Sequence, residues 1–116
     1  MSRNQKNEVQ ELKEKLRLYS RDNIQYSDHF LIRMGQRNGD LEEVISLLLN
    51  PEKLVYLYKE KSRQGEIVYN LHFKISNTKT LKLPVIIDRY GHKNLYIITY
   101  IMVYEPWKKA VKKWIY

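Results

Sequence analysis

The chain contains no cysteine. This absence excludes disulfides, thiolate nucleophiles and cysteine-ligated metal sites, and it favours an intracellular, cytoplasmic location. No apolar run approaches the length that spans a bilayer, and the charged segment 1–16 lacks the apolar region of a secretory signal. We therefore expect neither secretion nor a membrane partner.

Glycine and histidine are both scarce. The four glycines are scattered, so the chain has no glycine-rich loop that could cradle a phosphate. The three histidines fall on different predicted elements without HxH or HExxH spacing, which argues against a metal site. No nucleophile elbow accompanies a serine, so a Ser-His-Asp hydrolase has no support. The sequence predicts no metal and no cofactor.

The composition predicts one folded domain with a strongly basic half. With 116 residues and 43% hydrophobic residues, the whole of 1–116 is expected to form a single domain around one core. Residues 51–116 hold thirteen lysines and arginines against five acidic residues, and the net charge of the chain is +8. A half with this charge favours a polyanionic partner, either nucleic acid or an acidic protein.

The N-terminal part of the chain has helical periodicity. Apolar residues recur at helical spacing over 5–19, and a second helix is expected over 27–37 with Ser27 as its N-cap. A third helix, capped by Asp40, ends at residues 50–51.

From residue 54 the period changes to two, which indicates strands. These are expected over 54–58, 66–76, 81–88 and 95–104, and a short helix is expected after Pro106. Pro84 lacks an amide donor and suggests a sheet edge or a bulge. The predicted fold is therefore α+β, with N-terminal helices, a four-stranded antiparallel sheet and a short C-terminal helix.

The most informative segment is the second helix. At 100° per residue, His29, Arg33 and Arg37 lie within an arc of about 80°. The residues expected on the opposite side, where they could face a core, are Phe30, Leu31, Met34 and Gly35. One proton-transfer group and two cations would then project together from a supported helix. An ordinary solvated helix face has the same pattern, with His29 stacked or capped locally and the arginines either in water or paired with Asp28 and Asp40.

A longer pattern resembles a known family over roughly residues 24–104. It reads Tyr26-Ser27-x-His29-x3-Arg33-Met34-x2-Arg37-x2-Asp40-x-Glu42-Glu43-Val44, then Asn50-Pro51, and later Ile98-Thr99-Tyr100. This pattern is similar to that of an uncharacterised-domain family in the RelE/ParE toxin superfamily, to which BrnT-type toxins are related. The resemblance implies a RelE-like helix-plus-sheet domain, often a ribonuclease toxin neutralised by a cognate antitoxin. The superfamily also includes gyrase poisons and members without demonstrated activity, so the resemblance alone does not establish catalysis.

Metal-independent RNA cleavage needs a base for the 2′-OH, cations for the phosphate and an acid for the leaving oxygen. His29 is the leading candidate for base or acid, and Arg33 and Arg37 are candidates for gripping phosphate oxygens. His72 and Tyr100 are the second-rank catalytic candidates.

Lysines supply the predicted RNA contacts. Lys74 shares a strand face with Asn70 and His72, a face that could instead be merely solvated. In the C-terminal helix, tryptophans are expected to pack on the sheet while its lysines contact RNA or an acidic partner. These lysines are Lys108, Lys109, Lys112 and Lys113.

The leading hypothesis is a toxin-like endoribonuclease, an mRNA interferase that cleaves RNA, in one version mRNA on the ribosome. Its expected partners are RNA or the ribosome and a cognate, acidic antitoxin. The alternatives are a non-catalytic basic module that binds nucleic acid or an acidic protein, and a ParE-like gyrase inhibitor.

Overall fold

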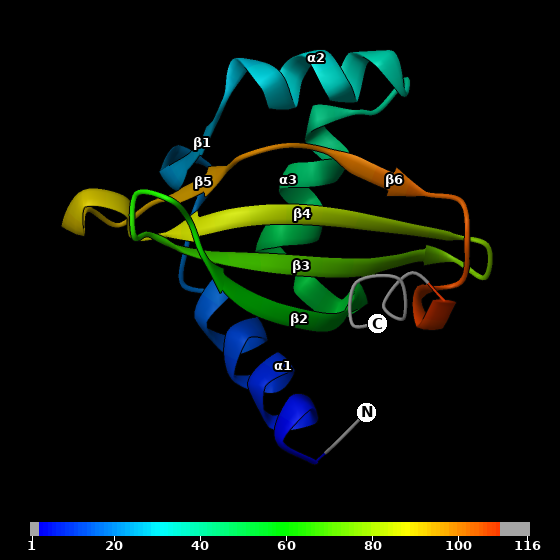
Figure 1. The fold of residues 1–116 in the computed structure, drawn as a ribbon, viewed down its shortest axis with the longest axis horizontal. Helices are drawn as coiled ribbons and strands as arrows, with labels where there is room; N and C mark the ends of the chain where they lie inside the picture. The colour runs from blue at the N-terminus through cyan, green and yellow to red at the C-terminus, as the bar shows by residue number, and fades with distance from the viewer. Residues whose placement is uncertain (1–2, 110–116) are drawn as a thin grey trace.

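Three α-helices precede the main sheet in the computed structural model, which describes residues 3–109, with side chains from residue 5 (Figure 1). The helices are α1 (Arg3–Leu16), α2 (Asp28–Gln36) and α3 (Leu41–Leu49), close to the predicted ranges. Three 3₁₀ turns connect elements: η1 (Arg21–Asn23), η2 (Pro51–Lys53) and η3 (Arg89–Gly91). The side chains of Ser27 and Asp40 cap α2 and α3, as predicted.

Six strands form the sheet of the described chain. They are β1 (Ile24–Tyr26), β2 (Leu54–Lys61), β3 (Ile67–Ser76), β4 (Lys79–Ile87), β5 (Leu95–Ile97) and β6 (Ile101–Val103). The order is β1-β5-β4-β3-β2, and β6 pairs with β4. Because β1 runs parallel to β5, the sheet is mixed. The predicted α+β class is confirmed, but the four-stranded antiparallel sheet is wrong.

The predicted strand 95–104 is broken in two, and Pro84 explains the break. Strand β4 pairs with β5 through Val85–Ile87 and with β6 through Thr80–Lys82, so Pro84 lies between the two ladders. The carbonyl of Pro84 accepts from the amide of Ile98 at 2.9 Å, but proline has no N–H to return to the Ile98 carbonyl. That carbonyl accepts instead from Ser27 Oγ at 2.5 Å. The proline thus lies in a central strand, at a point where its missing donor is replaced.

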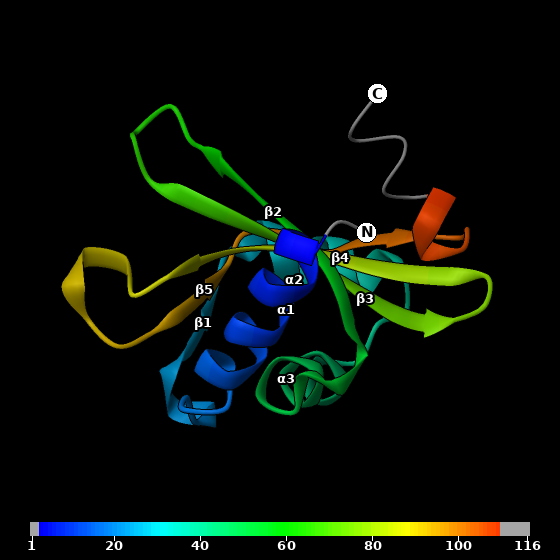
Figure 2. The same ribbon diagram turned by 90° about the horizontal axis from the view of Figure 1, so that it is seen from below.

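The core lies between the helices and one face of the sheet. Figure 2 shows α1 and α3 on the same side of the sheet, and Figure 1 shows α2 along the edge that contains β5 and β6. Apolar side chains from these elements are buried together. They include Val9, Leu12, Leu16, Phe30, Val44, Leu48, Leu71, Leu83, Val85 and Ile97.

A helix begins at Trp107, as the sequence predicts after Pro106, and the amide of Lys109 donates to the Pro106 carbonyl at 3.0 Å. Trp107 is half-buried and lines a cleft with residues of α1 and β2, including Val9 and Leu54. Among the helices of the described residues, none combines the length and the apolar character needed to cross a bilayer.

Candidate functional site

Helix α2 is fixed at its N-terminus by Ser27. The Ser27 amide donates to the Ile97 carbonyl at 3.1 Å. The Ser27 hydroxyl donates to the Ile98 carbonyl and also accepts from the Phe30 amide at 3.0 Å. Phe30 is fully buried, and its ring centroid lies 6.1 Å from that of Tyr100. One polar residue and one apolar residue therefore attach α2 to the β5–β6 break and fix which face points outward.

The outward face carries the three residues that the sequence singles out. His29 and Arg37 are exposed and Arg33 is half-buried. Of the residues predicted to face the core, Phe30 is buried and Met34 is half-buried, whereas the prediction is wrong for Leu31 and Gly35, which are exposed. Within the described residues, neither arginine forms an ion pair with Asp28 or Asp40, so the pairing alternative has no support. Their guanidinium groups are thus placed to meet an anion from solution.

A polar cleft of about 190 Å³ opens at the C-terminal end of α2. Two predicted site residues, Arg37 and Tyr100, line it together although 63 positions separate them in the sequence. Its walls come from the α2–α3 connection, the β3–β4 turn and the β6 segment. The lining residues are Arg37, Asn38, Gly39, Asp40, Glu43, Val44, Ile75, Lys79, Leu81, Tyr100, Met102 and Tyr104.

Gly39 permits the close approach of Tyr100 to the α2–α3 connection. A Cβ at position 39 would lie 2.9 Å from the Tyr100 hydroxyl oxygen and 2.6 Å from Met34 Cγ, both too close for a side chain. Burial, with smaller contributions from Glu43 and Tyr104, raises the pKa of Tyr100. The hydroxyl is therefore protonated at neutral pH and is a weaker acid than that of an exposed tyrosine. The Tyr100 side chain as a whole is buried and belongs to the hydrophobic core.

The cleft also contains charged residues that sequence reasoning missed. Lys79, at the start of β4, adds a second cation, and its Nζ lies 5.8 Å from the Tyr104 ring centroid. Glu43, which the sequence pattern contains without a predicted site role, adds a carboxylate. No local signal marks either residue, because only the long-range contact between Tyr100 and Gly39 brings their elements together.

His72 lies on the opposite face of the sheet and is fully buried. Its Nδ1 donates to the Asn70 carbonyl at 3.2 Å, which fixes the neutral tautomer, and its Nε2 has no hydrogen-bond partner within residues 3–109. Burial is the main cause that lowers the pKa of His72 to about 4, and the nearby Lys82 ammonium lowers it further. His72 is therefore not brought together with His29, and Asn70 is buried as well rather than solvated.

Other polar side chains surround His72 on this face. Lys82, directly across from His72 in the β3–β4 ladder, donates from Nζ to the Tyr58 hydroxyl at 3.1 Å. Burial lowers the pKa of Lys82 and raises that of Tyr58. The Asn70 amide donates to Glu60 Oε1 at 3.1 Å. Within this group Asn70, His72 and Lys82 are buried, Tyr58 is half-buried and Glu60 is exposed.

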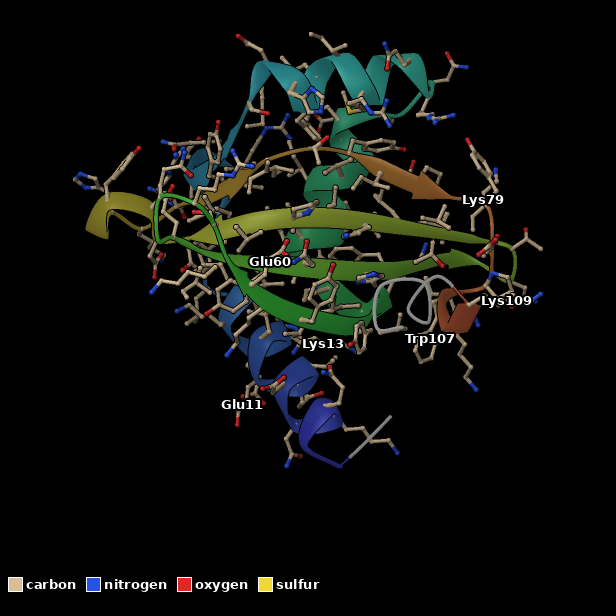
Figure 3. The ribbon with its side chains drawn as sticks, in the orientation of Figure 1. Glu11, Lys13, Glu60, Lys79, Trp107 and Lys109 are labelled. Atoms are coloured by element: carbon tan, nitrogen blue, oxygen red, sulfur yellow. The ribbon has the colours of Figure 1, made fainter. Side chains whose placement is uncertain are left out.

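The predicted RNA-binding lysines are placed in part. Lys74, Lys108 and Lys109 are exposed, whereas Lys112 and Lys113 lie outside the described residues. Figure 3 shows Lys109 and Lys79 at the same end of the sheet, where β3 turns into β4.

Asp88 and Arg89, adjacent in the sequence, form ion pairs with residues of other elements. Asp88 contacts Lys15 at 3.6 Å, and Arg89 contacts Glu66 at 3.0 Å. Within the described residues, no three His, Asp or Glu side chains gather as metal ligands would.

Comparison of the chain with protein-family models finds no match. Comparisons with curated proteins and with solved structures likewise find none.

Proposed function

We propose that this protein is a metal-independent endoribonuclease of the RelE/ParE toxin type, which acts from the outward face of α2. The observation that carries the proposal is that Arg37 and Tyr100 line one cleft at the C-terminal end of α2, the helix that bears the exposed His29 and the half-buried Arg33. The arginines on it have no ion-pair partner among the described residues. A single-stranded polyanion is the ligand that such a surface fits.

The order of residues along α2 matches the order of groups in the reaction. His29 lies one helical turn before Arg33, and the cleft opens one turn after it, so the whole face spans about 12 Å. Arg33 would grip the reacting phosphodiester, with a proton acceptor on one side and a proton donor on the other. Displacement at phosphorus with the attacking and leaving oxygens in line needs this arrangement.

In the proposed reaction, His29 takes the proton from a ribose 2′-OH, and the 2′ oxygen attacks phosphorus. Arg33 stabilises the extra charge on the phosphate oxygens, while Arg37 and Lys79 hold the next nucleotide in the cleft. The bond from phosphorus to the 5′ oxygen breaks, and that oxygen takes a proton from the Tyr100 hydroxyl. The products are a 2′,3′-cyclic phosphate and a 5′-hydroxyl, and no metal takes part.

The predicted partners follow from the same charges. RNA or the ribosome would supply the substrate, and an acidic antitoxin would neutralise the basic surface that includes Lys74, Lys108 and Lys109. A cytoplasmic location is part of this proposal, because mRNA and ribosomes are there.

A direct test is incubation of purified protein with RNA, with and without ribosomes, in the presence of a metal chelator. The proposal expects cleavage that survives the chelator and leaves 2′,3′-cyclic phosphate ends. Cleavage only with added Mg²⁺, or products with 5′-phosphate ends, would contradict the mechanism.

A second candidate is a basic module that binds RNA or an acidic protein without cleaving it. The burial of His72 favours it, because the predicted second imidazole is withdrawn from the surface. Under this alternative, His29→Ala would leave binding intact, whereas replacing Lys108 and Lys109 by glutamate would abolish it. A ParE-like gyrase inhibitor would instead produce DNA damage without RNA loss.

A further inference from the structure

The η3 segment exposes the Tyr90 ring to solvent, and two of its residues have positive φ values. Asp88 and Tyr90 have φ values of 56° and 59°, a region that side-chain-bearing residues rarely adopt, and Gly91 follows at 75°. The Tyr90 ring is nevertheless 79% exposed, the highest value among the large hydrophobic side chains of the described residues. The buried Asn94 holds this backbone, because its side chain accepts from the Arg89 amide at 3.0 Å and donates to the Arg89 carbonyl at 3.1 Å. The loop thus keeps the Tyr90 ring in solvent.

The Tyr90 ring packs against the Arg89 guanidinium, which residues of other elements hold in place. The Arg89 guanidinium carbon lies 4.9 Å from the Tyr90 ring centroid and 4.4 Å from that of Tyr96 in β5. Glu66, in the β2–β3 connection, holds Arg89 with two hydrogen bonds of 3.0 and 3.2 Å. Arg89 therefore contacts the rings of both Tyr90 and Tyr96. These contacts orient the Tyr90 ring before any ligand binds.

A cleft of about 370 Å³ lies between the end of α1 and the η3 segment, and it is lined by Asp88 and Gly91, which flank Arg89 and Tyr90 in the sequence. The carboxylate in it, Asp88, is already engaged by the Tyr19 hydroxyl at 2.5 Å and by Lys15 Nζ at 3.6 Å. Lys93 also lines the cleft, with its Nζ 5.6 Å from the Tyr19 ring centroid. With Asp88 paired, the Lys93 ammonium remains to attract a phosphate. The exposed Tyr90 ring of the same segment offers a flat face to a nucleobase.

We propose that η3 is a second RNA-binding site, where an unpaired nucleobase stacks on Tyr90 and the adjoining phosphate lies near Lys93. The proposal rests on the proposed function, since it takes RNA as the substrate. Every nucleobase has a flat face, so the site is tolerant of sequence but requires an unstacked base. An acidic protein segment would be attracted by Lys93, but it would gain nothing from the clamped Tyr90 ring.

The test uses two substitutions at one position. Tyr90→Asn removes the ring but suits the positive φ, whereas Tyr90→Phe keeps the ring. Fluorescence anisotropy would measure the Kd of the full-length protein for a single-stranded 2′-O-methyl RNA, which lacks the attacking hydroxyl and is not cleaved. The same strand annealed to its complement serves as the duplex control, and circular dichroism checks the fold of each variant.

We expect Tyr90→Asn to raise the Kd for the single strand about 5- to 150-fold, Tyr90→Phe to change it less than about twofold, and neither to alter duplex binding. Equal Kd values for wild type and Tyr90→Asn would overturn this site, while RNA binding by the wild type would leave the proposed function standing. Equal losses for single strand and duplex would also overturn it, because stacking would not be the cause. If the wild type bound no RNA, both proposals would fail.

Discussion

The buried His72 makes the stability of this protein depend on pH in a defined window. In the unfolded chain its imidazole titrates at the ordinary value of 6.5, whereas burial lowers the folded pKa to about 4. Protonation in the folded state would place a charge on Nε2, which has no hydrogen-bond partner, next to Lys82. The unfolded state therefore binds the proton first, and stability falls as the pH drops from about 6.5 to about 4.

The size of this loss follows from the shift in pKa. Each unit of difference between the folded and unfolded states is worth about 1.4 kcal/mol, so the folded protein loses about 3 kcal/mol across the window. Below about pH 4 both states are protonated at His72, and this contribution to the pH dependence ends. A loss of that size is a large part of the total stability of a small domain.

Urea denaturation followed by circular dichroism at several values from pH 7 to pH 4 measures the effect. In His72→Asn, whose amide can still donate to the Asn70 carbonyl, the stability difference from wild type should shrink by about 3 kcal/mol toward pH 4. His72→Phe gives a second non-titrating variant, and Lys74→Gln, an exposed change two residues away on the same strand, should keep the wild-type profile. Parallel profiles for wild type and both His72 variants would refute the reasoning.

Three further predictions concern α2. Ser27→Ala should lower the free energy of unfolding, measured by urea titration, by about 2–3 kcal/mol, because it removes a helix cap and the donor to the Ile98 carbonyl. Ser27→Thr keeps the hydroxyl and should lose much less. Gly39→Ala should lower the melting temperature, because its new methyl would clash with the side chains of Met34 and Tyr100. Gly35→Ala should raise the melting temperature, because no described atom lies within 4 Å of its new methyl. A higher melting temperature for Gly39→Ala than for Gly35→Ala would contradict the packing. Arg33→Lys should slow RNA cleavage although the charge is kept, since an ammonium cannot replace the planar fork; an unchanged rate would remove Arg33 from the proposed mechanism.

Sequence patterns predicted the helices well because their signals are local. The hydroxyl of Ser27 and the carboxylate of Asp40 cap helices within three residues of themselves, and apolar spacing sets the buried face of each helix. The same spacing correctly placed Phe30 in the core and His29 outside it.

The sheet and the cleft depend on contacts that no local pattern contains. Strand β1 pairs with β5 across about seventy positions, and the break between β5 and β6 needs both Pro84 in one strand and Ser27 in another element. Alternation in β3 correctly separated its two faces, but it could not indicate that the face with His72 would be buried too. Tyr100 was predicted as a second-rank site residue, whereas its cleft neighbour Lys79 was missed.

The central claim is that the outward face of α2 cleaves RNA, and the rate of cleavage under single-turnover conditions tests it most directly. We expect His29→Ala to slow this rate by about 10²–10⁴, the usual contribution of general acid–base catalysis, and Arg33→Ala to slow it as well. Arg63→Ala, an exposed arginine in the β2–β3 turn, is the matched control and should retain the wild-type rate. Wild-type rates in folded His29→Ala and Arg33→Ala, or no cleavage by the wild type with or without ribosomes, would contradict the account.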